Sequence, residues 1–291
     1  MAGRVWRLTR FELAKLFRQW FVYACFALTA GMTWLGIHFT SEEMEGFWKR
    51  TGFDYIVQGV SMALVLLPMM LLVIGSRSVS GEASGGTLRT VMTRPITRTD
   101  FILAKILSLV VLSLTLYLAM LLVAEGLAWH KADRFRALFP TYPVGGGREV
   151  PSQTPARTIA ELLQESVRNL SLLYLPLLSA ALFGLFVSVL FNNEGVSVSI
   201  SALFFLPYLI CAGVYPSAGS KGILPSKYAQ WLAQYHLVTP LDKLRLYVEG
   251  YSHGYGWSGE ELVRAIGVPL GYVVVLSAIS LWVFRKRNIL V

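Results

Sequence analysis

The sequence predicts an all-α polytopic membrane protein with six transmembrane helices, and three observations carry that prediction. Of 291 residues, 55% are hydrophobic and 15% are charged, whereas soluble domains contain about 25% charged residues. Six apolar runs are long enough to cross a hydrocarbon layer of about 30 Å. Basic residues flank these runs instead of forming an aromatic-bearing soluble face, so we expect no nucleic-acid partner. The predicted spans are Phe21–His38, Tyr55–Gly75, Phe101–Glu125, Leu170–Phe191, Val196–Tyr215 and Ala265–Phe284.

Residues 1–20 predict an amphipathic helix that precedes the six-span domain of residues 21–291. Its basic residues fall on one side at 100° per residue: Arg4, Arg7, Lys15 and Arg18. Its apolar residues gather on the other side: Val5, Trp6, Leu13, Leu16, Phe17 and Trp20. A helix of this kind lies in the membrane interface, with its basic face toward anionic headgroups. We therefore expect membrane lipids to be a partner of this segment.

The distribution of charge predicts that both ends of the chain are cytoplasmic. An even number of spans puts the two termini on one side of the membrane. If that side is the cytoplasm, it holds 13 of the 26 basic residues and only 4 of the 17 acidic residues, although its loops are the shorter ones. Cytoplasmic loops are enriched in lysine and arginine, so this orientation satisfies the positive-inside rule.

Three outer segments follow from this orientation: residues 39–54, 127–169 and 216–264. The second contains a Gly/Pro-rich portion, which predicts a loop, and then an apolar helical face from Ile159 to Leu170 that we expect to lie on the outer leaflet. The third is rich in tyrosine and tryptophan, as is typical of the membrane interface.

A polar segment, residues 78–100, separates the second and third spans and cannot lie in hydrocarbon. Glycines at 81, 85 and 86 interrupt the helix that leaves the second span. A short helix is predicted over Thr87–Thr93, and Pro95 ends it. Thr97 and Asp100 form a T-x-x-D capping box for the third span. By these patterns alone the segment is either a docking surface or an ordinary basic loop.

The runs E-x-x-x-G-T-L-R, T-R-P-I-T-R and F-I-L-A-K between Glu82 and Lys105 resemble the signature of ATP-binding-cassette type-2 exporter permeases. The basic entry helix, the six spans and the basic FRKRNIL tail agree with that family. In the family, the segment between spans two and three carries a coupling helix that inserts into a groove on a separate ATPase subunit. The outer segment of residues 127–169 is long for the family.

The resemblance implies roles for individual residues of this segment. Those in or beside the coupling helix are Gly86, Thr87, Leu88 and Arg89, with Glu82 before it and Pro95, Arg98 and Lys105 after it. Glu82 is expected to form an ion pair with Arg89 or Arg98, or to remain a solvated single charge. Leu88→Asp or Arg89→Glu is expected to uncouple the ATPase without loss of folding.

The sequence contains none of the motifs that would make this chain an enzyme. The phosphate-binding pattern G-x-x-x-x-G-K-[ST] is missing, so ATP and Mg²⁺ are expected on a partner chain and no cofactor on this one. The four histidines and two cysteines are scattered, which predicts no metal site. Glu125, near a predicted span end, either contacts a cationic substrate or marks where the helix meets water.

The resemblance therefore implies a permease subunit of an exporter in the bacterial cell membrane. It would pair with a second permease subunit, identical or a sister chain, and with two ATPase subunits. The alternative from another class is a signalling or scaffolding membrane protein that recruits a cytoplasmic partner and transports nothing. An ion-coupled carrier ranks last, because such proteins place charges at mid-membrane and the predicted spans hold none there.

Overall fold

The computed structural model describes residues 2–43, 52–93, 96–131, 141–144, 148–151, 159–214 and 259–287. Within these residues the chain is helical apart from one two-stranded hairpin. The helices are α1 Ala2–Leu16, α2 Trp20–Glu43, α3 Gly52–Arg77, α4 Ser80–Ser84, α5 Thr87–Met92, α6 Arg98–Lys131, α7 Ile159–Leu190, α8 Glu194–Val214 and α11 Gly259–Lys286. The strands are β1 Thr141–Val144 and β2 Arg148–Pro151.

Among the described residues, five helices are long and apolar enough to cross a membrane, which supports a multi-pass helical membrane protein. They are α2, α3, α6, α7 and α11. The predicted fifth span, Val196–Tyr215, falls on α8. The side chains of α8 are described only over Glu194–Phe205, and this apolar stretch is short for a span that needs about 20 residues. The sixth crossing therefore stays a prediction.

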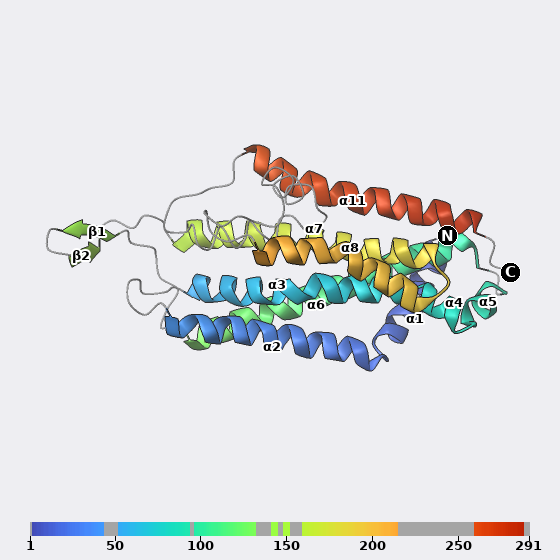
Figure 1. Cartoon of the computed structure of the whole chain (residues 1–291), viewed down its shortest axis with the longest axis horizontal. Coiled ribbons are helices and arrows are strands. Elements are labelled where there is room, and N and C mark those ends of the chain that lie inside the picture. Colours follow the sequence, from blue (N-terminus) through green and yellow to red (C-terminus); the bar gives the residue numbers. More distant parts are fainter. Residues whose placement is uncertain are drawn as a thin grey trace.

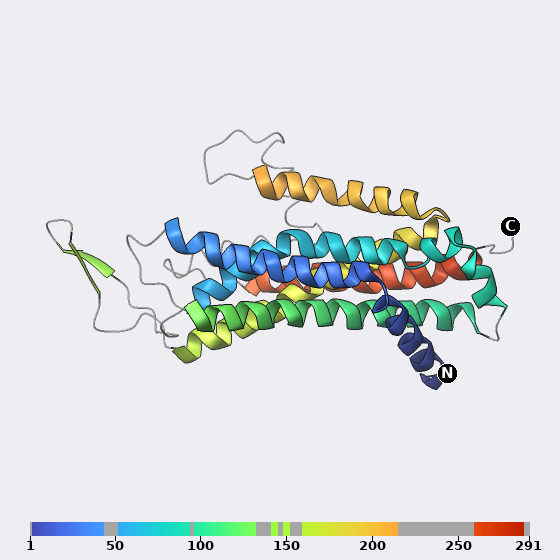
Figure 2. The same cartoon turned by 90° about the horizontal axis from the view of Figure 1, so that it is seen from below.

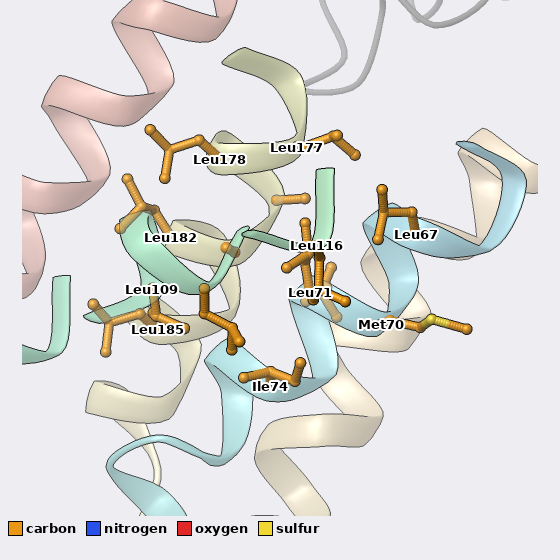
Figure 3. Close-up of a cluster of buried hydrophobic side chains, with 14 of the residues drawn as sticks. Leu67, Met70, Leu71, Ile74, Leu109, Leu116, Leu177, Leu178, Leu182 and Leu185 are labelled. Atoms are coloured by element: carbon orange, nitrogen blue, oxygen red, sulfur yellow. The ribbon is translucent and has the colours of Figure 1, made fainter. Parts of the chain in front are cut away.

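Helix α7 lies at the centre of the bundle and packs most extensively against α3. In the apolar membrane-crossing stretch of α7, 72% of the residues are buried, whereas in that of α11 only 17% are buried. Glycines set the closeness of α3 and α7, because a Cβ added at Gly184 would lie 2.3 Å from the Leu72 carbonyl oxygen. Leucines from α3, α6 and α7, among them Leu71, Leu116 and Leu177, point toward one another in the resulting core (Figure 3).

The helices α1, α4 and α5 and the C-terminal end of α11 lie at one end of the bundle, and the hairpin projects from the other (Figure 1). We call the end that contains α1, α4, α5 and the C-terminal end of α11 the basic end, because arginines and lysines of these helices gather there. Helix α1 leaves the direction of the bundle at an angle (Figure 2). Helix α1, the α4–α5 segment and the C-terminal end of α11 thus lie at one end of the bundle, and the side of the membrane that this end faces stays a prediction.

The structure corrects the predicted outer segments. The stretch from Ile159 to Leu170 is not a separate helix on the outer leaflet, because it continues without a break into α7. No glycine or proline stands at that junction to interrupt the backbone hydrogen bonds. Helix α6 likewise runs on past Glu125 to Lys131. Part of the predicted Gly/Pro-rich loop is an antiparallel hairpin in which Thr141 pairs with Pro151.

The remaining outer stretches divide between helices and undescribed residues. Residues 39–43 belong to α2 and residues 52–54 to α3. Most of the aromatic-rich third segment, residues 215–258, lies outside the described residues, and α11 begins at Gly259.

Candidate functional site

The candidate site is the α4–α5 segment with the helices that hold it. At the start of α4, Val79 has no side chain that can accept the free backbone N–H groups. Ser188 of α7 takes this role, since its Oγ accepts hydrogen bonds from the N–H groups of Val79 and Ser80, each at 2.8 Å. The Ser80 hydroxyl in turn donates to the Ser76 carbonyl at 2.6 Å. The segment is thereby fixed to α7 as soon as it leaves α3.

Gly86 makes the turn between α4 and α5, as the sequence predicts. Its φ of 70° lies in the left-handed region that favours glycine, and it is the one described glycine with a positive φ. The N–H of Gly85 donates to the Gly81 carbonyl at 3.1 Å, and that of Gly86 to the Ala83 carbonyl at 3.2 Å. Helix α4 therefore ends in hydrogen-bonded turns before α5 starts in a new direction.

Helix α5 has one buried and one exposed side. Leu88 is only 4% exposed and belongs to the hydrophobic core, with Val91 partly buried beside it. Thr87, Thr90 and Thr93 are exposed on the segment and form what we call the threonine face. A partner that contacts α5 from outside meets this face and not Leu88.

This geometry corrects the expectation that Leu88→Asp leaves folding intact. The substitution would put an unpaired carboxylate into the core, which is strongly unfavourable. The side chain of Arg89 and residues Arg94 and Pro95 lie outside the described parts of the structure, so the expectations for Arg89 and Pro95 stay predictions.

A buried ion cluster lies beneath the segment and consists of Glu12, Lys15, Glu82 and Lys105. The Nζ atom of Lys105 donates to Glu12 Oε2 at 2.8 Å and to Glu82 Oε1 at 2.6 Å. Lys15 also donates to Glu82 Oε1. The side chains of Lys105 and Glu82 are 3% and 5% exposed, whereas that of Lys15 is 40% exposed. The cluster thus joins α1, α4 and α6 and has one side chain open to solvent.

Charge balance makes this burial possible. Two carboxylates face two ammonium groups, and buried charges persist in proteins when they are paired in this way. Burial alone would raise the pKa of Glu82, but Lys105 and Lys15 outweigh it, so the pKa of this carboxyl lies below its usual value. Its second oxygen, Oε2, is buried without a hydrogen-bond partner in the described structure. Glu82 is therefore an ionised group held by its two lysines.

The comparisons with known proteins identify the family of the chain. Residues 19–290 match the family described as a protein of unknown function (DUF2705). The chain belongs to this family. No curated protein matches the sequence. In this DUF2705 member the matched region contains α4, α6 and the bundle, while Glu12 and Lys15 stand on α1, ahead of it.

In this DUF2705 member, the predicted pairing of Glu82 with Arg98 is wrong. Arg98 donates to the carbonyl oxygens of Arg285 at 3.1 Å and Arg287 at 2.6 Å, at the C-terminal end of α11. The last carbonyls of a helix have no N–H partner within that helix, so the C-terminal end of a helix is a good acceptor site for a guanidinium. Arg287 in turn donates to the Val189 carbonyl of α7. Arg98 therefore fastens α11 to the start of α6, while Glu82 is held by lysines.

Sequence reasoning missed that Lys15 and Lys105 pair with Glu82, and that Glu12 pairs with Lys105. Val5, Thr9 and Glu12 form the buried face of α1 that packs against α6, so a polar and a charged side chain lie on the packed side of this helix. One signal was present in the sequence, because Glu12 is the only acidic residue among residues 1–20. A single carboxylate in so basic a helix indicates a specific partner.

The other predicted residues fall in two places. Gly86 and Thr87 lie at the turn and on the threonine face, and the start of α6 is capped by Thr97, whose Oγ1 accepts from the Asp100 N–H at 3.1 Å. Glu125 is exposed near the far end of α6, away from the ion cluster.

Proposed function

We propose that this chain is the permease subunit of an ATP-binding-cassette exporter in the bacterial plasma membrane. It crosses the membrane six times, with α8 as the fifth crossing and the basic end in the cytoplasm. A second permease subunit, identical or a sister chain, completes the path for the substrate. Two separate ATPase subunits bind ATP and Mg²⁺ and dock on the α4–α5 segment.

One observation carries this proposal. The α4–α5 segment, where the signature that resembles exporter permeases begins, is exposed on one side and is held by the helix bundle on the other. The threonine face offers a contact surface at the basic end. Behind it, Leu88 packs in the core. Ser188 fixes the start of the segment to α7, and Lys105 ties it to α6. A displacement of the threonine face by a docked partner would therefore be transmitted to α7 and α6.

The threonine face also provides the test. The tagged chain is purified from its native host with the proteins that accompany it, and ATPase activity is measured in nanodiscs. We expect an ATPase to co-purify. We expect Thr87→Arg/Thr90→Arg to reduce both its recovery and its activity at least about tenfold, because two long charged side chains would obstruct close contact with α5; a tenfold loss corresponds to about 1.4 kcal/mol of binding free energy.

A matched control distinguishes docking from folding. Ala160→Arg/Gln164→Arg adds the same two positive charges at exposed positions on α7, near the opposite end of the bundle. It should leave ATPase recovery unchanged. If the wild-type chain recovers a cytoplasmic partner without ATPase activity, the signalling or scaffolding alternative replaces the exporter proposal.

A further inference from the structure

The ion cluster joins three elements that are far apart in the sequence. Lys105 belongs to α6, Glu82 to α4, and Glu12 and Lys15 to α1. One ammonium group, that of Lys105, donates to carboxylates of both α1 and α4. Lys15, one turn after Glu12 on α1, reaches the same Glu82 oxygen. Helix α1 is thus bound to α4 directly and also through the side chain of a span.

The burial of this cluster separates it from ordinary surface pairs. Salt and side-chain entropy weaken exposed pairs, such as Glu260 and Arg264 of α11 at 3.5 Å. Buried pairs are screened much less. Displacing α4 from α1 would leave Lys105 or a carboxylate buried without its partner, which is strongly unfavourable. The cluster therefore resists separation of α1 from α4.

Helix α1 is also joined closely to the first span. Only residues 17–19 separate α1 from α2, and they carry hydrogen bonds themselves. The Arg18 N–H donates to the Lys15 carbonyl at 3.2 Å, and the Val22 N–H donates to the Gln19 carbonyl at 3.1 Å. A displacement of α1 is therefore transmitted to the start of α2.

We propose that α1 and α4 move as one unit on α6, and that the ion cluster transmits a displacement of the α4–α5 segment to α2 as well as to α6. The single unit is a property of this chain alone. Only the source of the displacement, a docked ATPase, rests on the proposed function. Ser188 and the Thr97 cap connect the segment to α7 and α6, whereas the cluster adds a route through α1 to α2.

A distance measurement tests the unit without any partner protein. Ala14 of α1 and Thr90 of α5 are both exposed and accept spin labels after replacement by cysteine, in a chain whose Cys25 and Cys211 are replaced by alanine. Pulsed electron–electron double resonance in nanodiscs then gives the distribution of distances between the two spin labels. In the wild-type cluster we expect a narrow distribution.

The decisive variant removes all three buried charges together, as Glu12→Met/Glu82→Met/Lys105→Met. Replacing a buried ion group by apolar residues of similar volume commonly preserves folding. We expect the distance distribution to widen about twofold or more, because α1 and α4 then lose their electrostatic connection. The matched control, Glu260→Gln/Arg264→Met, removes an exposed pair and should leave the width unchanged. An unchanged width in the triple variant would overturn the proposal.

A milder variant covers the case in which the triple variant does not fold. Glu12→Gln leaves Glu82 with both lysines and weakens only the contact of α1 with Lys105. It should widen the distribution less than the triple variant, and again no widening would count against the unit. The readout also separates the two proposals. If the wild-type chain gives a narrow distance distribution but no ATPase co-purifies with it, the exporter proposal is wrong. The proposal that α1 and α4 move as one unit is then still supported.

Discussion

Two ion-pair sites at the basic end connect helices in different ways. Lys105 holds α1 and α4 together on α6, and its side chain and that of Glu82 are almost completely buried. Arg77 of α3 contacts Glu194 of α8 at 2.5 Å, but these side chains are 42% and 35% exposed. Both sites join segments that are far apart in the sequence. Only the first lies where water and salt have little access.

The comparison shows that burial, and not the presence of a pair, decides how firmly two helices are tied. An exposed pair contributes about 0–1 kcal/mol, because solvent screens it and two long side chains must be ordered. Losing one partner of a buried pair costs about 3–5 kcal/mol, because the other charge stays buried alone. The α1–α4–α6 junction is therefore expected to be rigid and the α3–α8 junction to be adjustable.

The largest effect is expected for Lys105→Ala. It leaves Glu12 and Glu82 facing each other without Lys105, and we expect a loss of about 3–5 kcal/mol of unfolding free energy. Denaturant titration of the purified protein in mixed micelles measures it. Arg10→Ala, which removes an exposed basic side chain of α1, is the control and should change stability by less than about 0.5 kcal/mol. A similar small loss for Lys105→Ala would mean that the cluster is not a buried ion site.

A second substitution tests the apolar anchor of the same segment. Leu88→Ala removes a buried side chain that packs in the core, and we expect a loss of about 2–5 kcal/mol. Thr90→Ala, on the exposed side of α5, should cost less than about 0.5 kcal/mol. The same titration measures both. Equal effects of the two substitutions would show that α5 has no distinct buried side.

Acid should weaken the buried site. The pKa of Glu82 is lower in the folded protein than in the unfolded chain. Its contribution to stability is therefore present above the ordinary carboxyl pKa of about 4.3, and it is lost as the pH falls through the lowered folded pKa. Unfolding measured across this acidic range should show a smaller decline in Glu82→Gln than in wild type. A decline of equal size in both would assign the acid sensitivity to other carboxyls.

The smallest effect is expected for the exposed pair. Arg77→Gln should lower stability by about 1 kcal/mol or less, and added salt should reduce the difference from wild type. The matched substitution Glu194→Gln should behave alike, because it removes the same contact. Unfolding in low and high salt tests this. A large, salt-independent loss would mean that the pair is effectively buried.

The sequence predicted some parts of the basic end and missed others, for identifiable reasons. Local chemistry set the glycine turn at Gly86 and the Thr97 cap of α6, and both are found where the patterns place them. The contacts that α1 makes in the ion cluster could not be read from local spacing, because Lys15 stands 67 residues from Glu82 and Glu12 stands 93 residues from Lys105 along the chain. Arg98 was a plausible neighbour by spacing, yet its guanidinium reaches the end of α11.

The sequence by itself determined that this chain is a bundle of membrane-crossing helices, because the length and apolar content of each run suffice to indicate a span. It also determined the short polar segment between α3 and α6, since glycine, proline and threonine act through the local backbone. Only the tertiary structure decided which face of α1 is buried, which side of α5 is exposed and which charges meet at Lys105. Those choices depend on contacts between distant helices, and no local pattern specifies them.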